Sequence, residues 1–176
     1  APATTAIHQR VEACRAGTDP TVIARIRSGW AVLGDPQVLP GYCLLLPDPV
    51  VPHLNAMEPA LQQAFLADMA RIGQLLLQNG QWQGKPLLPA AFVERMRTPL
   101  PQARFYGHSL WMDPDHSAPF YFLQGHQGQC VIVVPSEQLV VVRLGQFREQ
   151  VRWRHPKNIE EIYLFADVGR RMVAGR

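Results

Sequence analysis

The serines are the first residues to consider for catalysis, because a hydroxyl attacks an acyl carbon only with a base in hydrogen-bond reach. None of them has a lysine three residues later; they are Ser28, Ser109, Ser117 and Ser136. His108 lies beside Ser109, but Trp111 stands where the Gly-x-Ser-x-Gly elbow requires glycine. Adjacent strand residues also point to opposite faces, so this pair would not meet. The sequence therefore predicts no catalytic residue among the serines.

A metal site and a thiol nucleophile are the other chemistries to weigh. Histidines and aspartates that could gather at one sheet end are His108, Asp113, Asp115, His116 and His126. Their spacing matches no standard zinc pattern, and a polar turn is the simpler interpretation. Cys14, near His8, has an equally weak claim as a nucleophile–base pair. We therefore predict no metal ligand and no cofactor.

The cysteines and the net charge indicate the cellular compartment and the classes of binding partner. Cys14, Cys43 and Cys130 are odd in number and far apart, and the last two sit in apolar runs, which predicts small buried thiols. No apolar run approaches the roughly 18 residues of a membrane span. The net charge is +3, carried by scattered arginines with no basic face, which argues against nucleic acid. These features predict a cytoplasmic protein without a membrane or nucleic-acid partner, and a homodimer stays open.

One long helix is predicted to position the strands and the short helices around it. Asn55 is predicted to cap it, with Glu58 three residues later in a capping-box arrangement, and Gly80 is predicted to end it after Asn79. Apolar residues recur at helical spacing and predict its buried face: Leu61, Phe65, Met69, Ile72 and Leu76.

Strands and short helices surround this helix. Residues 22–33 and 38–46 are predicted to form a hairpin, and residues 105–112, 120–134 and 139–145 a meander. The valine-rich runs of the last two strands predict burial on both faces. Short helices are expected at 7–16, 89–97 and 159–173, the last with Ile159, Ile162, Leu164 or Phe165, and Met172 inward. The fold class is α+β, a mainly antiparallel sheet with the long helix packed across it.

The first half of the chain carries four segments in a distinctive order: Ser28–Asp35, Pro40–Asp48, Leu54-Asn55 and Phe65–Met69. With these segments, about residues 8–77 resemble the histidine-triad (HIT) family of nucleotide hydrolases and transferases. That family works through a His-x-His-x-His run, and no His-x-His occurs in this chain. His53 matches no catalytic position of the family, so the resemblance implies nucleotide binding without catalysis at most.

The second half carries another ordered set of segments: Asp68–Gly80, Leu87–Pro89, Tyr106-Gly107, Gly125–Gln129 and Val140–Gly145. With these segments, about residues 66–146 resemble the C-terminal part of the serine β-lactamase-like hydrolases, the class C-type β-lactamases and penicillin-binding esterases. His126-Gln127-Gly128 matches the family's His-x-Gly strand motif, and Gln129 would supply an oxyanion N–H. This implies a substrate-binding edge at His126, Gln127, Gly128 and Gln129 for a small ester or amide. The family's Ser-x-x-Lys and Tyr-x-Asn motifs are absent.

Together these patterns predict one domain over 1–176, with a HIT-like hairpin segment (1–55), a shared helix (56–79), a β-lactamase-like segment (80–146) and a C-terminal tail and helix (147–176). The predicted function is that of a hydrolase-like protein, inactive or weakly active as an esterase or amidase. The alternatives are a non-catalytic structural or binding protein, as a recombined or designed hybrid, and a HIT-like nucleotide binder.

Overall fold

The structure, a computed structural model, describes residues 4–35, 42–115, 118–125, 128–145 and 155–175, with side chains in the last range given from Glu160 onward. The chain divides into two compact units, residues 1–68 and 69–176, and the boundary falls inside the long helix. Helices and antiparallel strands are both present in quantity, so the α+β class is confirmed. No helix in the described ranges combines the length and apolarity needed to cross a membrane.

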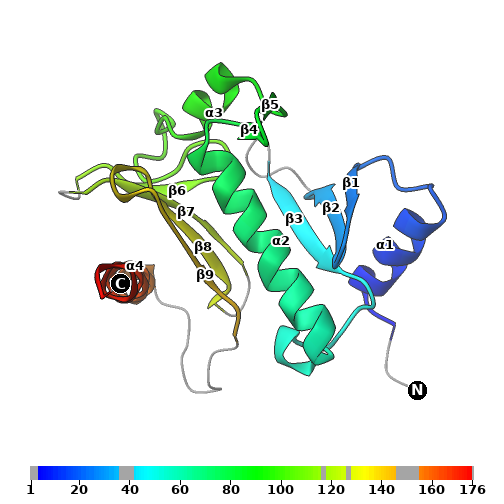
Figure 1. Cartoon of the computed structure of the whole chain (residues 1–176). Helices are drawn as coiled ribbons and strands as arrows, with labels where there is room; N and C mark the ends of the chain where they lie inside the picture. Colours follow the sequence, from blue (N-terminus) through cyan, green and yellow to red (C-terminus); the bar gives the residue numbers. More distant parts are fainter. Residues whose placement is uncertain (1–3, 36–41, 116–117, 126–127, 146–154, 176) are drawn as a thin grey trace. The chain divides into compact units, whose positions relative to one another are not determined.

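The N-terminal unit is a helix and a three-stranded antiparallel sheet (Figure 1). Its elements are α1 (Ala6–Arg15), β1 (Val22–Ile26), β2 (Gly29–Leu33), β3 (Cys43–Pro47), the 3-10 turn η1 (Leu54–Ala56) and the first part of α2 (Pro59–Leu77). Its small core is formed by Val11, Cys14, Val32 and Leu46. Cys43 is exposed, contrary to the expected buried thiol, since it begins β3 and only Leu46 of that strand is buried.

The expected single strand over 22–33 is wrong, because the chain turns back within it. β1 and β2 pair with each other around Arg27 and Ser28, and β3 then pairs with β2. The turn is held by Asp68 of α2, whose Oδ2 accepts hydrogen bonds from the Ser28 N–H (2.9 Å) and hydroxyl (2.8 Å). Ser28 and Asp68 are the buried polar residues of this unit among those described. A contact between residues 40 apart in sequence therefore stabilises this turn.

Helix α2 begins three residues later than the capping box predicts. Asn55 lies in η1, and Met57 is extended with φ −68° and ψ 145°. Pro59 explains the difference, because the residue before a proline is disfavoured in helical conformation while proline itself suits the first helical position. On the predicted face Phe65, Met69 and Leu76 are buried, whereas Leu61 and Ile72 are half-buried.

The end of α2 is shaped by two left-handed residues. Asn79 has φ 53° and Gly80 has φ 82°. The Gly80 N–H donates to the Leu75 carbonyl at 2.8 Å, and the Asn79 N–H donates to the Leu76 carbonyl at 3.2 Å. These two bonds define a Schellman motif with asparagine, not glycine, in the first left-handed position. Glycine is still required next, because a Cβ at Gly80 would lie 2.4 Å from the Leu88 carbonyl oxygen.

The C-terminal unit is built on a four-stranded antiparallel meander in the order β6-β7-β8-β9. After α2 come the hairpin β4 (Gln81–Trp82) and β5 (Lys85–Pro86), α3 (Ala90–Met96), β6 (Trp111–Asp113), β7 (Phe120–Gln124), β8 (Cys130–Val134), the 3-10 turn η3 (Pro135–Glu137), β9 (Leu139–Arg143) and α4 (His155–Ala174). The predicted meander is confirmed, but its first strand is only β6, and residues 120–134 form two strands rather than one.

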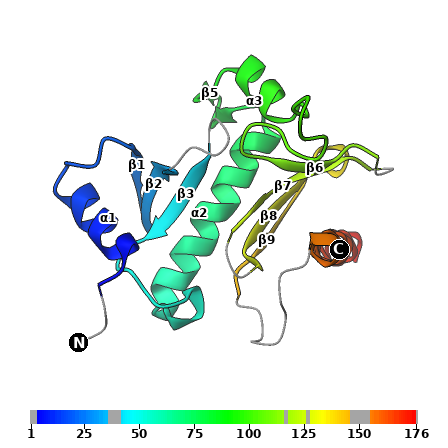
Figure 2. The same ribbon diagram turned by 180° about the vertical axis from the view of Figure 1, so that it is seen from behind.

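Both faces of this sheet are covered, by α4 on one side and by the C-terminal part of α2 on the other (Figures 1 and 2). A Cβ at Gly73 of α2 would lie 2.6 Å from Val140 and 2.7 Å from Val131, so the helix backbone contacts the sheet closely. The α4 side contains the main core, made by Phe120, Phe122, Cys130, Ile132, Val134, Leu139, Ile162 and Ala166. Every residue of β8 is buried, as predicted for a strand with two covered faces. The same prediction is wrong for β9, where only Leu139 is buried and residues 140–143 are half-buried, because β9 is the last strand of the sheet.

Helix α4 packs through part of the predicted face. Of the two alternatives Leu164 and Phe165, it is Phe165 that packs against the core. Ile162 is buried as expected, but Met172 is 72% exposed and Leu164 is 58% exposed. The contact with the sheet is made also by Ala166, which is fully buried, and by Gly169, where a Cβ would lie 2.4 Å from Val141. These small residues let the helix approach the strands closely, which the pattern of large apolar residues does not predict.

Acid is expected to destabilise the N-terminal unit through Asp48. This carboxylate accepts hydrogen bonds from Arg15 and from the Trp30 indole (3.0 Å), which hold its pKa below the ordinary 3.8. A pKa lowered by folding contributes stability above the unfolded value, and that stability is lost as the pH falls through the folded pKa. Hydrogen exchange of β2 and β3 amides should therefore show protection falling below pH 3.8.

The matched comparison for this prediction is Asp48→Asn. The variant should have lower protection at neutral pH and a smaller further loss in acid, because its amide does not titrate. Equal acid sensitivity in both proteins would contradict the role of Asp48.

Candidate functional site

The segment that joins β7 to β8 carries the predicted substrate-binding residues. Gly125 follows β7 and its N–H donates to the Gln129 carbonyl at 2.8 Å, which closes the segment at its base. Gly128 is buried with φ 83°, a conformation that favours glycine. His126 and Gln127 lie outside the described residues. The structure thus describes Gly128 and Gln129 of the predicted binding edge, together with Gly125, which precedes it.

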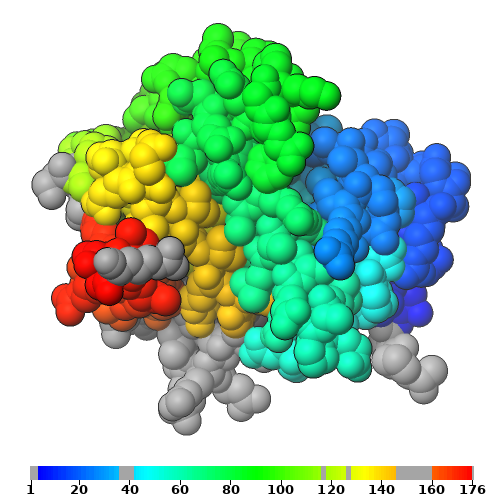
Figure 3. Space-filling model, in the orientation of Figure 1, coloured from blue at the N-terminus to red at the C-terminus, as the bar shows by residue number. Residues whose placement is uncertain are grey.

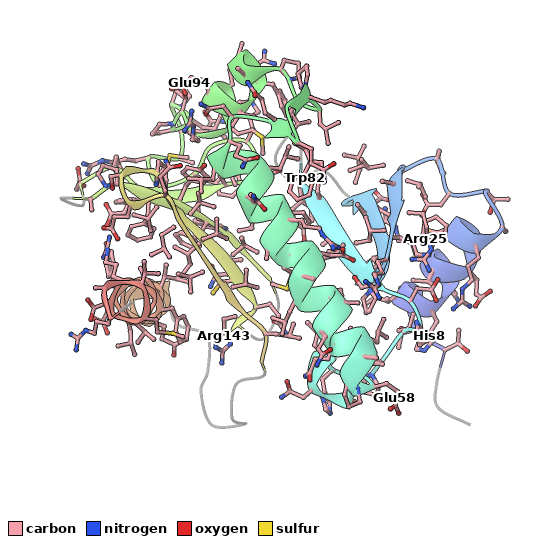
Figure 4. All side chains as sticks on the ribbon, in the orientation of Figure 1. His8, Arg25, Glu58, Trp82, Glu94 and Arg143 are labelled. Atoms are coloured by element: carbon pink, nitrogen blue, oxygen red, sulfur yellow. The ribbon has the colours of Figure 1, made fainter. Side chains whose placement is uncertain are left out.

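Arg143, at the end of β9, holds this segment from the neighbouring strand. Its backbone is paired with Cys130, and its guanidinium Nη1 donates to the Gly128 carbonyl at 2.6 Å. The guanidinium also lies over the Phe165 ring, 5.1 Å from the centroid. Figure 4 labels Arg143 at this end of the sheet, at the far end of the unit from Glu94 of α3. Arg143 therefore brings a positive charge to the predicted binding edge and fixes one of its carbonyls.

Gln129 forms a second link between the segment and β9. Its Nε2 donates to the Gly145 carbonyl at 2.8 Å, just beyond the end of β9. Its Oε1 is buried and accepts no hydrogen bond from any residue in the described ranges. The side chain and the backbone carbonyl of Gln129 are thus both bonded within the scaffold. The oxyanion role of the Gln129 N–H stays a prediction.

Sequence reasoning missed Arg143 as a residue of this site. The antiparallel pairing of the two predicted strands could have revealed it, because the end of β9 then lies opposite the start of β8. A cation at that strand end is therefore close to the segment preceding β8.

The thiol hypotheses gain no support from the geometry. The His8 ring is bonded to Thr5, and Cys14 Sγ is 3.7 Å from Asp19 Oδ2, so these two residues are not brought together. Burial and the neighbouring Asp19 raise the pKa of the Cys14 thiol. Burial likewise raises the pKa of Cys130 to about 11, so this thiol is protonated at neutral pH.

His108 and Ser109 lie before β6 rather than on a strand. The Gly107 N–H donates to the Leu110 carbonyl at 2.8 Å, and Tyr106 pairs with Trp111 across this tight turn. Ser109 has a left-handed φ of 66°, and the His108 Nδ1 is buried without a hydrogen-bond partner among the described residues. The prediction that the two side chains do not form a nucleophile–base pair remains a prediction.

The acidic residues proposed for a metal are engaged by protein groups. Asp113 accepts hydrogen bonds from the Tyr163 hydroxyl and the Asp115 N–H, and Asp115 is paired with Arg104. Within the described ranges, no three His, Cys, Asp or Glu residues gather as a metal site would need. His116 and His126 lie outside those ranges.

A shallow hollow of about 420 Å³ lies at the opposite end of β7 from the predicted binding edge. Its walls are Glu94, Arg97, Pro99, Met112, Asp113, Pro114, Pro119, Phe120, Tyr121 and Pro135. Arg97 is already bonded to Glu94 (2.6 Å) and Asn79 (2.9 Å), and Asp113 is bonded to Tyr163. The charged groups that line the hollow are thus already bonded to each other or to residues of neighbouring elements.

Comparisons with known proteins give a distant structural likeness. No family model matches the chain, and no curated protein matches it. Among solved structures, the chain is similar to a Bacillus anthracis protein assigned as a 6-aminohexanoate-dimer hydrolase, at 26% identity and a TM-score of 0.48. The match covers 63% of this chain, which spans 30% of the length of that protein. The HIT and serine-hydrolase resemblances and the hybrid origin remain predictions.

Proposed function

We propose that the C-terminal unit is a hydrolase-like module that binds a small ester or amide at residues 126–129 and turns it over slowly or not at all. The observation that carries this proposal is the anchoring of Gly128 by Arg143, at 2.6 Å from guanidinium to carbonyl. A binding edge works only when its backbone is held in place before the ligand arrives. The segment here is held twice, by Arg143 and by the Gln129 side chain.

Slow turnover follows from the placement of the serines. Ser28 is buried and bonded to Asp68 in the N-terminal unit, and Ser136 lies in η3, at the other end of β8 from the binding segment. Ser109 lies in the turn before β6, and Ser117 is outside the described residues. None has lysine three residues later, so the general base of the serine-hydrolase pattern has no counterpart.

The test is hydrolysis of p-nitrophenyl acetate and nitrocefin by the wild type and three variants. We expect slow, linear product release without a burst, because one oxyanion donor and a positioned cation act without a nucleophile. In complete enzymes one such donor accounts for about 10²–10³ of the rate. Without a nucleophile, the acceleration that remains here should be small compared with that of a complete enzyme. His126→Ala should lower the rate towards that of buffer. Arg143→Met, which keeps the apolar stem but loses the bond to Gly128, should lower it as well.

His53→Ala is the matched control, since it makes the same substitution at an exposed histidine of the N-terminal unit. Its rate should equal that of the wild type. A burst with a serine-trapped adduct in mass spectrometry would prove a working nucleophile and refute slow turnover. Rates equal to buffer in every protein, with no binding of the product acids by titration calorimetry, would favour the non-catalytic alternative.

A further inference from the structure

Helix α4 presents a second apolar stripe, on the side away from the sheet. Leu164 is 58% exposed, Val168 is 45% exposed and Met172 is 72% exposed. They recur every four residues, so they form one continuous row along a helix of 3.6 residues per turn. The packed face is a different one, made by Ile162, Ala166 and Gly169. In Figure 3 the surface of α4 (red) lies beside that of β8 and β9 (yellow) at the edge of the unit.

We propose that this stripe, defined by Leu164, Val168 and Met172, docks against the same stripe of a second copy of the chain, with the two helices antiparallel. The charges along the helix argue for this occupant. Among the α4 side chains described, the acidic residues Glu160, Glu161 and Asp167 all precede the basic residues Arg170 and Arg171. Arg170 is already paired with Glu137. An antiparallel copy therefore brings Glu160 and Glu161 of one helix to the end of the other helix that carries Arg171.

The register of this pairing follows from helical geometry. Leu164 and Val168 have their midpoint at Ala166, so a two-fold axis at that level places Leu164 opposite Val168 of the second copy. Glu160 and Arg171 have nearly the same midpoint. They are separated by about three turns and lie on the same side of the stripe. A two-fold axis brings like sides of an antiparallel pair together, so Glu160 of each copy faces Arg171 of the other.

Two features limit the strength of this association. Asp167 lies close to the two-fold axis and would approach its own copy, but its carboxylate is 2.8 Å from Arg171, which offsets the repulsion. A single helix pair also buries far less than the roughly 800 Å² per partner of standard stable interfaces. The dimer should therefore dissociate on dilution, within the concentration range that sedimentation covers.

The experiment is sedimentation equilibrium of the full chain over a dilution series. The wild type should show a monomer–dimer equilibrium, and Val168→Lys should weaken it on the order of a hundredfold by placing a charge in the apolar row. Ile23→Lys is the matched control, because Ile23 is 55% exposed on β1 and lies outside the stripe. It should associate like the wild type, with all variants showing wild-type circular dichroism.

Charge exchange tests the register itself. Glu160→Arg and Arg171→Glu each create two like-charge pairs in the homodimer, and each should weaken it on the order of tenfold. A mixture of the two variants restores both opposite-charge pairs, so the heterodimer should form more readily than either homodimer. A wild type that is monomeric at every concentration, or a mixture no more associated than its components, would overturn the proposal.

Discussion

Replacing Phe120 with alanine is expected to lower the free energy of unfolding of the C-terminal unit by about 3–5 kcal/mol. Phe120 is 2% exposed and packs against Phe122 and, edge to face at 5.4 Å, against Tyr163. The truncation leaves a cavity between the sheet and α4, where Ile132 and Ala166 are already fully buried. Hydrogen exchange of β7, β8 and β9 amides measures the loss in this unit alone.

The control for this substitution is Phe105→Ala, the same chemical change at a side chain that is 43% exposed. It should cost less than about 1 kcal/mol, because little apolar area is returned to water. Equal losses for the two variants would mean that Phe120 does not occupy the core described here.

Asp68→Ala should have the second largest effect, a loss of about 2–5 kcal/mol in the N-terminal unit. The substitution leaves the buried N–H and hydroxyl of Ser28 without their shared acceptor, and each unsatisfied group costs about 1–3 kcal/mol. The β1–β2 turn should open with it, so exchange protection should fall first in those two strands.

A double-mutant cycle with Ser28→Ala checks that the loss arises from this contact. If the two residues act through their hydrogen bonds, the double variant should lose less than the sum of the single variants, by about 0.5–3 kcal/mol. Strictly additive losses would show that Asp68 stabilises the unit through other neighbours.

The elements of this fold were predictable where local signals agree. The valine runs of β8 and β9, the short helices α1 and α3 and the glycines between β7 and β8 all lie where their residue types place them. The start of α2 was missed because two local signals compete, and the conformational restriction before Pro59 overrides the capping residues at Asn55 and Glu58.

Other features depend on distant residues and could not be read locally. The turn at Ser28 requires Asp68, 40 positions away, and the inward face of α4 is set by the approach of Gly169 to Val141. At the candidate site, the motif over residues 126–129 stays a prediction from sequence, whereas the bond from Arg143 to Gly128 emerges only from strand pairing.

The nearest-neighbour order of the strands has a kinetic consequence. In the described residues, each strand of both larger sheets pairs with the strand next to it in sequence. Such pairings need only short loops to close, and loop closure is what slows the folding of most sheet proteins. Each sheet can grow hairpin by hairpin, so strand formation should be fast for a protein of this strand content. The slower step is then the docking of α4, which follows β9 only after an intervening segment.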